Sequence, residues 1–207
     1  MNSTICRIGV FYDGSYVTKA QNYFCSKQKG WLYFTPFHEL IKHFIEKEEP
    51  GYSKYKIVYA YWHQGLFPAH KAEHKHLEKD RKRDIDLLKA NIQFKPQEVS
   101  ELQGEKGVDV ALALDALELG IAGKIDVAVL VTGDGDFVPL VKKLAQYRIR
   151  VATVYFEYKN EHNGNNYDSY MDQALKDLSD YCLDVNSLEG NPEYTTLFHQ
   201  LFRKREA

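Results

Sequence analysis

The chain has 207 residues, of which 44% are hydrophobic and 14% aromatic, and its formal net charge is −2. This length suits one domain with a full hydrophobic core, and the composition excludes a disordered chain. The charge excludes a global basic field of the kind that marks many nucleic-acid-binding proteins, although a local basic patch remains open.

The hydrophobic pattern predicts strands that alternate with helices along the chain. Strands are expected over about 5–12, 56–62, 91–95, 126–131, 149–156 and 181–185. Helices are expected over about 16–28, 36–47, 107–120, 137–147 and 170–179, with one more after Pro192. The charged stretch 70–90 places Leu77, Ile85 and Leu88 roughly on one helical face, and 157–170 is expected to be a polar loop.

This alternation predicts an α/β fold with a mainly parallel sheet that is covered on both faces. We expect a domain over residues 1–185 and a helical tail over 186–207. Apolar residues recur at helical spacing in the tail, namely Tyr194, Phe198, Leu201 and Phe202. The default interpretation of this pattern is that the tail packs on the domain's own surface. The more specific alternative is a contact between two copies in a homodimer.

Cysteine usage and the apolar segments predict a location. Cys6, Cys25 and Cys182 are scattered and form no CxxC pair, which makes zinc fingers and disulfide frameworks unexpected. Reduced thiols in the cytoplasm are the expected state. The N-terminus runs straight into the first expected strand and leaves no room for a signal peptide. With no apolar stretch long enough to span a bilayer, we expect no membrane partner.

Acidic residues follow two of the expected strands and begin one expected helix. Asp13 follows the apolar run 8–12, Asp134 and Asp136 follow 127–131, and Asp109 lies at the start of the helix over 107–120. Ligands of open α/β sheets bind at the carboxyl ends of the strands. Clustered carboxylates repel one another unless a cation neutralises them, and oxygen ligands without Cys favour Mg²⁺ or Mn²⁺. The pattern therefore predicts one shared metal site.

Each of these acids also has a purely structural interpretation. Asp136 could cap the helix over 137–147. Asp13 could belong to an ordinary turn in which Ser15 caps the next helix. The helix macrodipole alone would favour Asp109 in a first turn. Asp115 lies about 240° round the helix from Asp109, which predicts a structural role for it. Gly133 and Gly135 are expected to turn the backbone with positive φ.

The sequence resembles the NYN group of PIN-like nucleases, and within it the LabA-like branch. Three stretches carry the resemblance: Val-Phe-Tyr-Asp-Gly at 10–14, Lys-Gly-Val-Asp-Val at 106–110 and Val-Thr-Gly-Asp-Gly-Asp-Phe at 131–137. Residues 178–181 are similar to the family's closing segment, and spacing and order agree across about residues 5–185. The family commonly has Asn where this chain has Ser15-Tyr16, and Gly where it has Tyr147-Arg148.

The resemblance implies a PIN-like three-layer α/β/α sandwich and a metal-dependent ribonuclease that hydrolyses RNA phosphodiester bonds. It implies that the catalytic and metal-binding residues are Asp13, Asp109, Asp134 and Asp136, holding Mg²⁺ or Mn²⁺.

A locally basic stretch suggests where RNA could bind. Lys75, Lys79 and Lys82 lie in the segment 70–83, and Ser15 follows the first acidic residue. These residues are candidates for RNA contact, although a solvated helix with pairs such as Glu78 and Lys82 also explains the charges. Single-stranded or loop RNA is expected, because a flexible strand can bend into a crevice at a sheet edge.

Two other functions fit parts of the pattern. One is a catalytically weak PIN-like module that binds RNA or a protein partner. The other is a phosphatase that uses Asp13 as its nucleophile, and it ranks last because Gly14-Ser15 follows where such enzymes carry a second Asp.

Overall fold

The structure is a computed structural model that describes residues 4–66, 74–98, 107–162 and 165–203. Six strands form one parallel sheet in the order β4-β3-β1-β5-β6-β9. They are β1 (Ile5–Asp13), β3 (Lys54–Leu66), β4 (Gln93–Glu98), β5 (Val127–Val131), β6 (Arg150–Tyr155) and β9 (Tyr181–Asp184).

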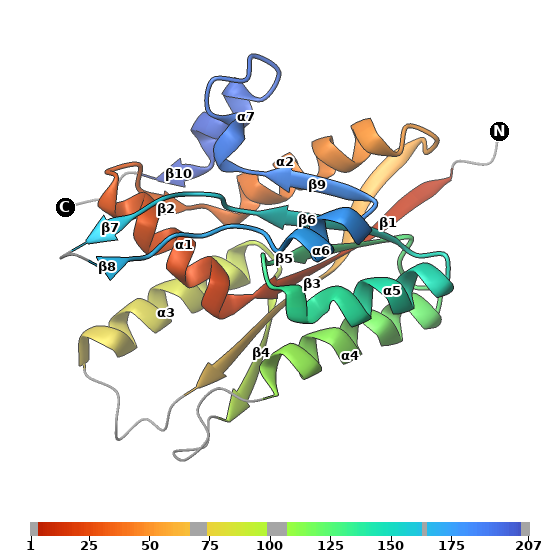
Figure 1. Cartoon of the computed structure of the whole chain (residues 1–207), viewed down its shortest axis with the longest axis horizontal. Coiled ribbons are helices and arrows are strands. Elements are labelled where there is room, and N and C mark those ends of the chain that lie inside the picture. The colour runs from red at the N-terminus through yellow and green to blue at the C-terminus, as the bar shows by residue number, and fades with distance from the viewer. Residues whose placement is uncertain (1–3, 67–73, 99–106, 163–164, 204–207) are drawn as a thin grey trace.

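Helices cover both faces of this sheet. They are α1 (Gly14–Ser26), α2 (Phe34–Glu48), α3 (His74–Lys89), α4 (Val108–Ile121), α5 (Val138–Gln146), α6 (Gln173–Leu178) and α7 (Thr195–Gln200). Figure 1 shows α2 and α7 on one side and α4 and α5 on the other. The predicted three-layer α/β fold with a mainly parallel sheet is confirmed. Among the described residues, no helix is long and apolar enough to cross a membrane.

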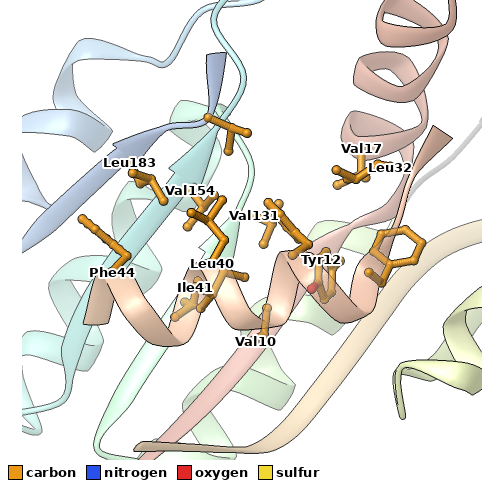
Figure 2. Close-up of a cluster of buried hydrophobic side chains, with 14 of the residues drawn as sticks. Val10, Tyr12, Val17, Leu32, Leu40, Ile41, Phe44, Val131, Val154 and Leu183 are labelled. Atoms are coloured by element: carbon orange, nitrogen blue, oxygen red, sulfur yellow. The ribbon is translucent and has the colours of Figure 1, made fainter. Parts of the chain in front are cut away.

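The core lies on both faces of the central strand β1. Val10 and Tyr12 point towards α1 and α2, as Figure 2 shows, whereas Phe11 packs on the opposite face with α4 and α5. Successive side chains of a strand alternate between faces, and a strand covered on both sides is apolar throughout. This explains why the run before Asp13 is continuously hydrophobic, and why the strand ends at a fixed place beside its neighbours.

Register brings several strand ends together. In the parallel pair of β1 and β3, Asp13 lies opposite His63, and in the pair of β1 and β5, Tyr12 lies opposite Val131. The residues that follow Val131 therefore lie next to Asp13 at the carboxyl edge of the sheet.

The chain after β6 differs from the expected polar loop. Two short strands, β7 (Glu161–His162) and β8 (Asn165–Asn166), form an antiparallel hairpin there, and Tyr158 bridges to Ser169. The prediction missed this hairpin because two-residue strands are too short to show an alternating pattern. The rings of Tyr158 and Tyr23 stack at 3.9 Å between centroids, which holds the hairpin against α1.

The tail packs on the domain itself. Tyr194, Phe198 and Leu201 are buried in the same cluster as α1 and α2. The tail ends in β10 (Phe202–Arg203), which pairs with β2 (Trp31–Leu32), and the sequence pattern had indicated neither strand. Because these side chains lie inside the chain's own core, they offer no homodimer contact.

The buried face of α3 is not the face that the pattern predicted. Leu77, Ile85 and Leu88 are exposed, whereas Leu87 is buried against the core. Half-buried Arg83 lies one turn before Leu87 on the same face, where its guanidinium stacks on the ring of Phe94 at 4.9 Å. A long charged side chain can cover apolar surface in this way, which is why counting apolar residues alone selected the wrong face.

Arg148 adopts a left-handed backbone conformation in the turn before β6, with φ of 59°. This is the turn in which the resembling family carries Gly, which reaches that conformation without steric cost. The substitution therefore leaves the turn intact.

Candidate functional site

The first acidic residue ends β1 and starts α1 at the same time. Asp13 is the N-cap of α1, and its Oδ1 accepts the backbone N–H of Tyr16 at 2.9 Å. The capping residue is Asp13, not Ser15, which corrects the expected turn. A side-chain oxygen at this position satisfies one of the free N–H groups of the first helical turn. Only Oδ1 of the carboxylate makes this capping bond.

The second acidic segment follows β5 and repeats this arrangement. Asp134 is the N-cap of a short 3₁₀ helix, η2 (Gly135–Phe137), and its Oδ1 accepts the N–H of Asp136 at 2.9 Å. The expected capping role therefore belongs to Asp134, and Phe137 precedes α5 without a side-chain cap. Asp134 and Asp136 are both exposed.

Thr132 joins the two acidic segments. Its hydroxyl donates to Oδ2 of Asp13 at 3.4 Å and accepts the backbone N–H of Asp134 at 3.2 Å. Thr132 is buried directly after β5, which pairs with β1. One hydroxyl between neighbouring strands thus holds the two acidic segments side by side.

The two glycines of the second segment serve close packing. Neither Gly133 nor Gly135 has positive φ, contrary to the expectation. A Cβ at Gly133 would lie 2.8 Å from the backbone oxygen of Tyr170, and one at Gly135 would lie 2.7 Å from the carboxyl carbon of Asp172. Only glycine allows the segment before α6 to approach this closely.

This packing adds an acidic residue that sequence reasoning missed. Asp172 is the N-cap of α6, where Oδ1 accepts the N–H groups of Ala174 and Leu175 at 2.9 and 3.1 Å, and its own N–H donates to the oxygen of Gly133 at 2.9 Å. An Asp directly before a helix is a capping signal. Nothing in the sequence places that Asp beside a loop some forty residues earlier.

Asp109 reaches the same edge by a different route. It lies in the first turn of α4, after Gly107 with φ of 86°, and its side chain is exposed. Helix α4 contacts β1, β3 and η2. In the residues that the structure describes, no three Asp, Glu, His or Cys side chains are close enough to hold a metal ion together. Thr132 thus links the carboxylate of Asp13 to the backbone of Asp134, whereas Asp109 and Asp136 are exposed and take no part in this bridge.

A buried histidine lies beside the first acidic residue. His63 is the residue of β3 that pairs with Asp13 of β1. It is fully buried, and its Nε2 lies 3.0 Å from Oδ2 of Asp115. Burial lowers the pKa of His63, and the carboxylate of Asp115 acts in the opposite direction. Asp115 also contacts Lys95 at 3.4 Å. Asp115 therefore has two partners of its own, His63 and Lys95, which supports the structural role expected for it.

Tyr16 occupies the position where the resembling family carries Asn. Its hydroxyl accepts the backbone N–H of Phe156 at 2.8 Å, and burial raises its pKa to about 12. The same hydroxyl would lie 3.3 Å from a Cβ at Gly133. Tyr16 therefore ties the end of β6 to the acidic loop as a neutral group, and it offers no amide to a ligand.

The candidate RNA-contacting lysines lie on α3. Lys79 and Lys82 are exposed there, and the side chain of Lys75 lies outside the described residues. Helix α3 follows β3 in the chain, so its first turns are near the carboxyl edge of the sheet. Ser15 is half-buried in the first turn of α1.

The sheet order and the helices on both faces define a three-layer α/β protein with a parallel sheet, in which two acidic segments follow neighbouring strands. Residues 7–182 match the NYN domain family. Since this match spans most of the chain, the protein belongs to the NYN domain family. NYN domains are generally nucleases, and the membership supports a hydrolase at that coarse level. The LabA-like branch stays a prediction.

A solved structure shares the fold. The crystal structure of a protein of unknown function from Vibrio parahaemolyticus matches with a TM-score of 0.59 at 20% sequence identity, over 89% of this chain and 94% of that one. At this identity the likeness shows the fold alone. No curated protein matches the chain.

Proposed function

We propose that the protein is a metal-dependent ribonuclease that hydrolyses RNA phosphodiester bonds. The observation that carries the proposal is the bridge through Thr132, which holds the carboxylate of Asp13 and the backbone N–H of Asp134 at the carboxyl ends of two neighbouring strands. Ligands of parallel sheets bind at this edge. Membership of the NYN family adds the class of reaction.

The donor set suits Mg²⁺ or Mn²⁺. Mg²⁺ keeps several of its waters and needs only one or two protein carboxylates together with phosphate oxygens of a substrate. Asp13 and Asp134 supply such a pair, with Asp109 and Asp136 as rim acids that hold waters or further ions. In the described part of the chain no Lys or Arg pairs with Asp134 or Asp136. When bound, the ion would lower the pKa of an attacking water and neutralise charge on the phosphate.

The substrate we propose is single-stranded or loop RNA in the cytoplasm, where free thiols such as those of this chain stay reduced. Lys75, Lys79, Lys82 and Ser15 are proposed to contact phosphates along the approach. Tyr170 adds a surface for a base, because 72% of it is exposed while its backbone oxygen packs against Gly133 of the acidic loop. Bases of single strands stack on such rings.

A cleavage assay tests the reaction. Short labelled RNAs should be cut slowly in Mg²⁺ or Mn²⁺ and not in EDTA, and Asp134→Asn should lower the rate at least about a hundredfold. Asn caps a helix as well as Asp does, so the variant keeps the fold and removes the charge. Asp177→Asn is the matched control, since Asp177 is exposed towards the far end of α6 and should leave the rate unchanged. Equal rates for both variants would refute the metal-site assignment.

Binding of RNA is tested separately with Tyr170. Tyr170→Ala should weaken binding of a short single strand by about fivefold to a hundredfold, because one stacked base contributes roughly 1–3 kcal/mol. Tyr147→Ala is the control, since Tyr147 is also exposed but follows α5 at the opposite edge of the sheet. Fluorescence anisotropy in EDTA measures binding without cleavage. Unchanged affinity for Tyr170→Ala would move the RNA path elsewhere.

One observation favours a second function, a catalytically weak module that binds RNA or a protein partner. Tyr16 stands where the resembling family carries Asn, and its hydroxyl accepts the backbone N–H of Phe156. It therefore supplies no side-chain amide to the site. Binding that responds to Tyr170→Ala, with no cleavage in either metal, would select this alternative.

A further inference from the structure

Helix α4 is apolar on its outer side as well as on its inner side. Its inner residues Leu112 and Ala116 are buried in the core. The outer side carries Val110, Leu114, Leu117 and Ile121, which we call the α4 stripe. Val110 and Leu114 are each 61% exposed and Ile121 is 51% exposed, whereas Leu117 is half-buried and packs partly against the core at the border of the stripe. Figure 1 shows α4 at the outside of the molecule.

The spacing of the α4 stripe is that of a helix–helix contact. Its residues follow at intervals of four, three and four, which is the a/d pattern of a heptad seam. At 3.6 residues per turn they fall within about 60° of one another, on the side opposite Leu112 and Ala116. A soluble helix normally presents polar residues on its outer side, and a contiguous apolar row there marks an interaction surface.

We propose that the α4 stripe joins two copies of this chain, which pack as antiparallel helices about a twofold axis. The stripe is symmetric about the midpoint between Asp115 and Ala116. In an antiparallel pair centred there, Val110 of one copy faces Ile121 of the other, and Leu114 faces Leu117. A twofold contact needs this self-complementarity, in which a patch matches its own rotated image.

The charges along α4 favour the antiparallel arrangement. The helix carries Asp109, Asp115 and Glu118 and no basic residue. In the antiparallel register Glu118 of one copy faces Ala113 of the other. In a parallel pair each acidic residue would instead lie near the same acidic residue of the other copy, and the two like charges would repel each other. The acidic start of one helix, at Asp109, also comes near the end of the other, where Lys124 is exposed. Antiparallel macrodipoles add to this attraction.

The size of the contact predicts a reversible dimer. Helix α4 has 14 residues and is therefore about 21 Å long. A single pair of such helices lies at the small end of specific interfaces, below about 1,200 Å². The dimer should therefore dissociate on dilution.

Sedimentation equilibrium of the full chain tests the proposal. Wild type should change from dimer to monomer on dilution, and Leu114→Glu should weaken the dimer by about a hundredfold or more, because two leucines per dimer lose their buried contacts. Leu114 is exposed in the monomer, so the variant should fold, which its melting temperature checks. Leu88→Glu is the control, since Leu88 is 78% exposed on α3 and should leave the dimer unchanged. A wild type that stays monomeric at all concentrations, or a dimer that survives Leu114→Glu, would overturn the proposal.

Cysteine cross-linking tests the direction of the helices. A mixture of Leu114→Cys and Leu117→Cys chains should form a disulfide-linked heterodimer on mild oxidation, and each variant alone should cross-link no more than wild type. Wild type is the blank for Cys6, Cys25 and Cys182. Cross-linking of Leu114→Cys with itself would indicate parallel helices and overturn the proposed register.

Discussion

Asp13 and Asp134 each combine a structural role with a chemical one. Each uses Oδ1 to cap a helix that follows a strand. Capping alone would explain an Asp at either position. It does not explain why Thr132 joins the two segments, or why glycine packing brings Asp172 to the same loop. The convergence across separate segments is what favours a site over two independent caps.

His38 gives the protein a pH-dependent stability that can be measured. It is buried on α2 beside the ring of Tyr12, at 6.1 Å between centroids, and burial lowers its pKa to about 4. The unfolded chain takes up a proton near pH 6.5, whereas the folded chain does so only near pH 4. The unfolding free energy should therefore fall as pH falls through this window, by up to about 3 kcal/mol.

Replacement of His38 by Leu should flatten this dependence. The comparison is the urea midpoint of wild type and His38→Leu at pH 7 and at about pH 4.5. His63, whose pKa burial also lowers, contributes in the same direction in both proteins and cancels. His199→Leu, at an exposed position on α7, is the control and should behave as wild type. A wild-type slope in His38→Leu would contradict the assignment.

Helix α3 shows how an element can be predicted while its orientation is not. The helix lies where the pattern placed it, yet its exposed residues include Leu77, Ile85 and Leu88. Arg83 occupies the inner side, held by Asp80 at 2.8 Å, by the amide oxygen of Gln64 at 3.0 Å and by the ring of Phe94. A charged residue with three such partners can face the domain, and the apolar face then turns outwards.

Adjacent leucines on α3 test this orientation. Leu87→Ala should cost about 2–5 kcal/mol of unfolding free energy, because it removes buried methyl groups and leaves a cavity. Leu88→Ala should change it by no more than about 0.5 kcal/mol, because Leu88 is mostly exposed. Chemical denaturation measures both. Equal losses would mean that α3 packs with the face that the sequence pattern suggested.

At the scale of the whole molecule, four helical segments begin with an aspartate at the N-cap or in the first turn. Asp13, Asp109, Asp134 and Asp172 come from four separate segments that begin α1, α4, η2 and α6. In the metal site that we propose, these like charges raise the free energy of the folded chain unless a cation neutralises them. A divalent ion should therefore act on the stability of the entire domain.

Thermal unfolding with and without metal measures this effect. Millimolar Mg²⁺ or Mn²⁺ should raise the melting temperature of wild type, since an ion at a hundredfold excess over its Kd adds about 2.7 kcal/mol. Asp134→Asn should reduce the rise, and without metal it should be slightly more stable than wild type, because it relieves repulsion. Asp177→Asn should respond to metal as wild type does. A melting temperature that metal leaves unchanged would argue against a metal site.

The sequence by itself determined the class of fold and the candidate acids. The apolar, β-branched run 127–131 indicated a buried strand, the alternation of strands and helices predicted a mainly parallel sheet, and the motifs around Asp13, Asp109 and Asp134 pointed to the NYN family. These features are local. They depend on the periodicity of side chains within one element and on the order of the elements, and both can be inferred from the sequence alone.

Only the tertiary structure decided which side chains meet and which faces are covered. Asp13 and Thr132 are separated by 119 residues, and their contact depends on the register of β1 against β5. The approach of Asp172, the inner position of Arg83 and the outward α4 stripe depend likewise on packing between distant segments. The physical reason is that burial is a property of the assembled surfaces. The sequence shows which side chains are apolar and can therefore be buried. Whether each of them is buried depends on the segments that pack against it in the folded chain.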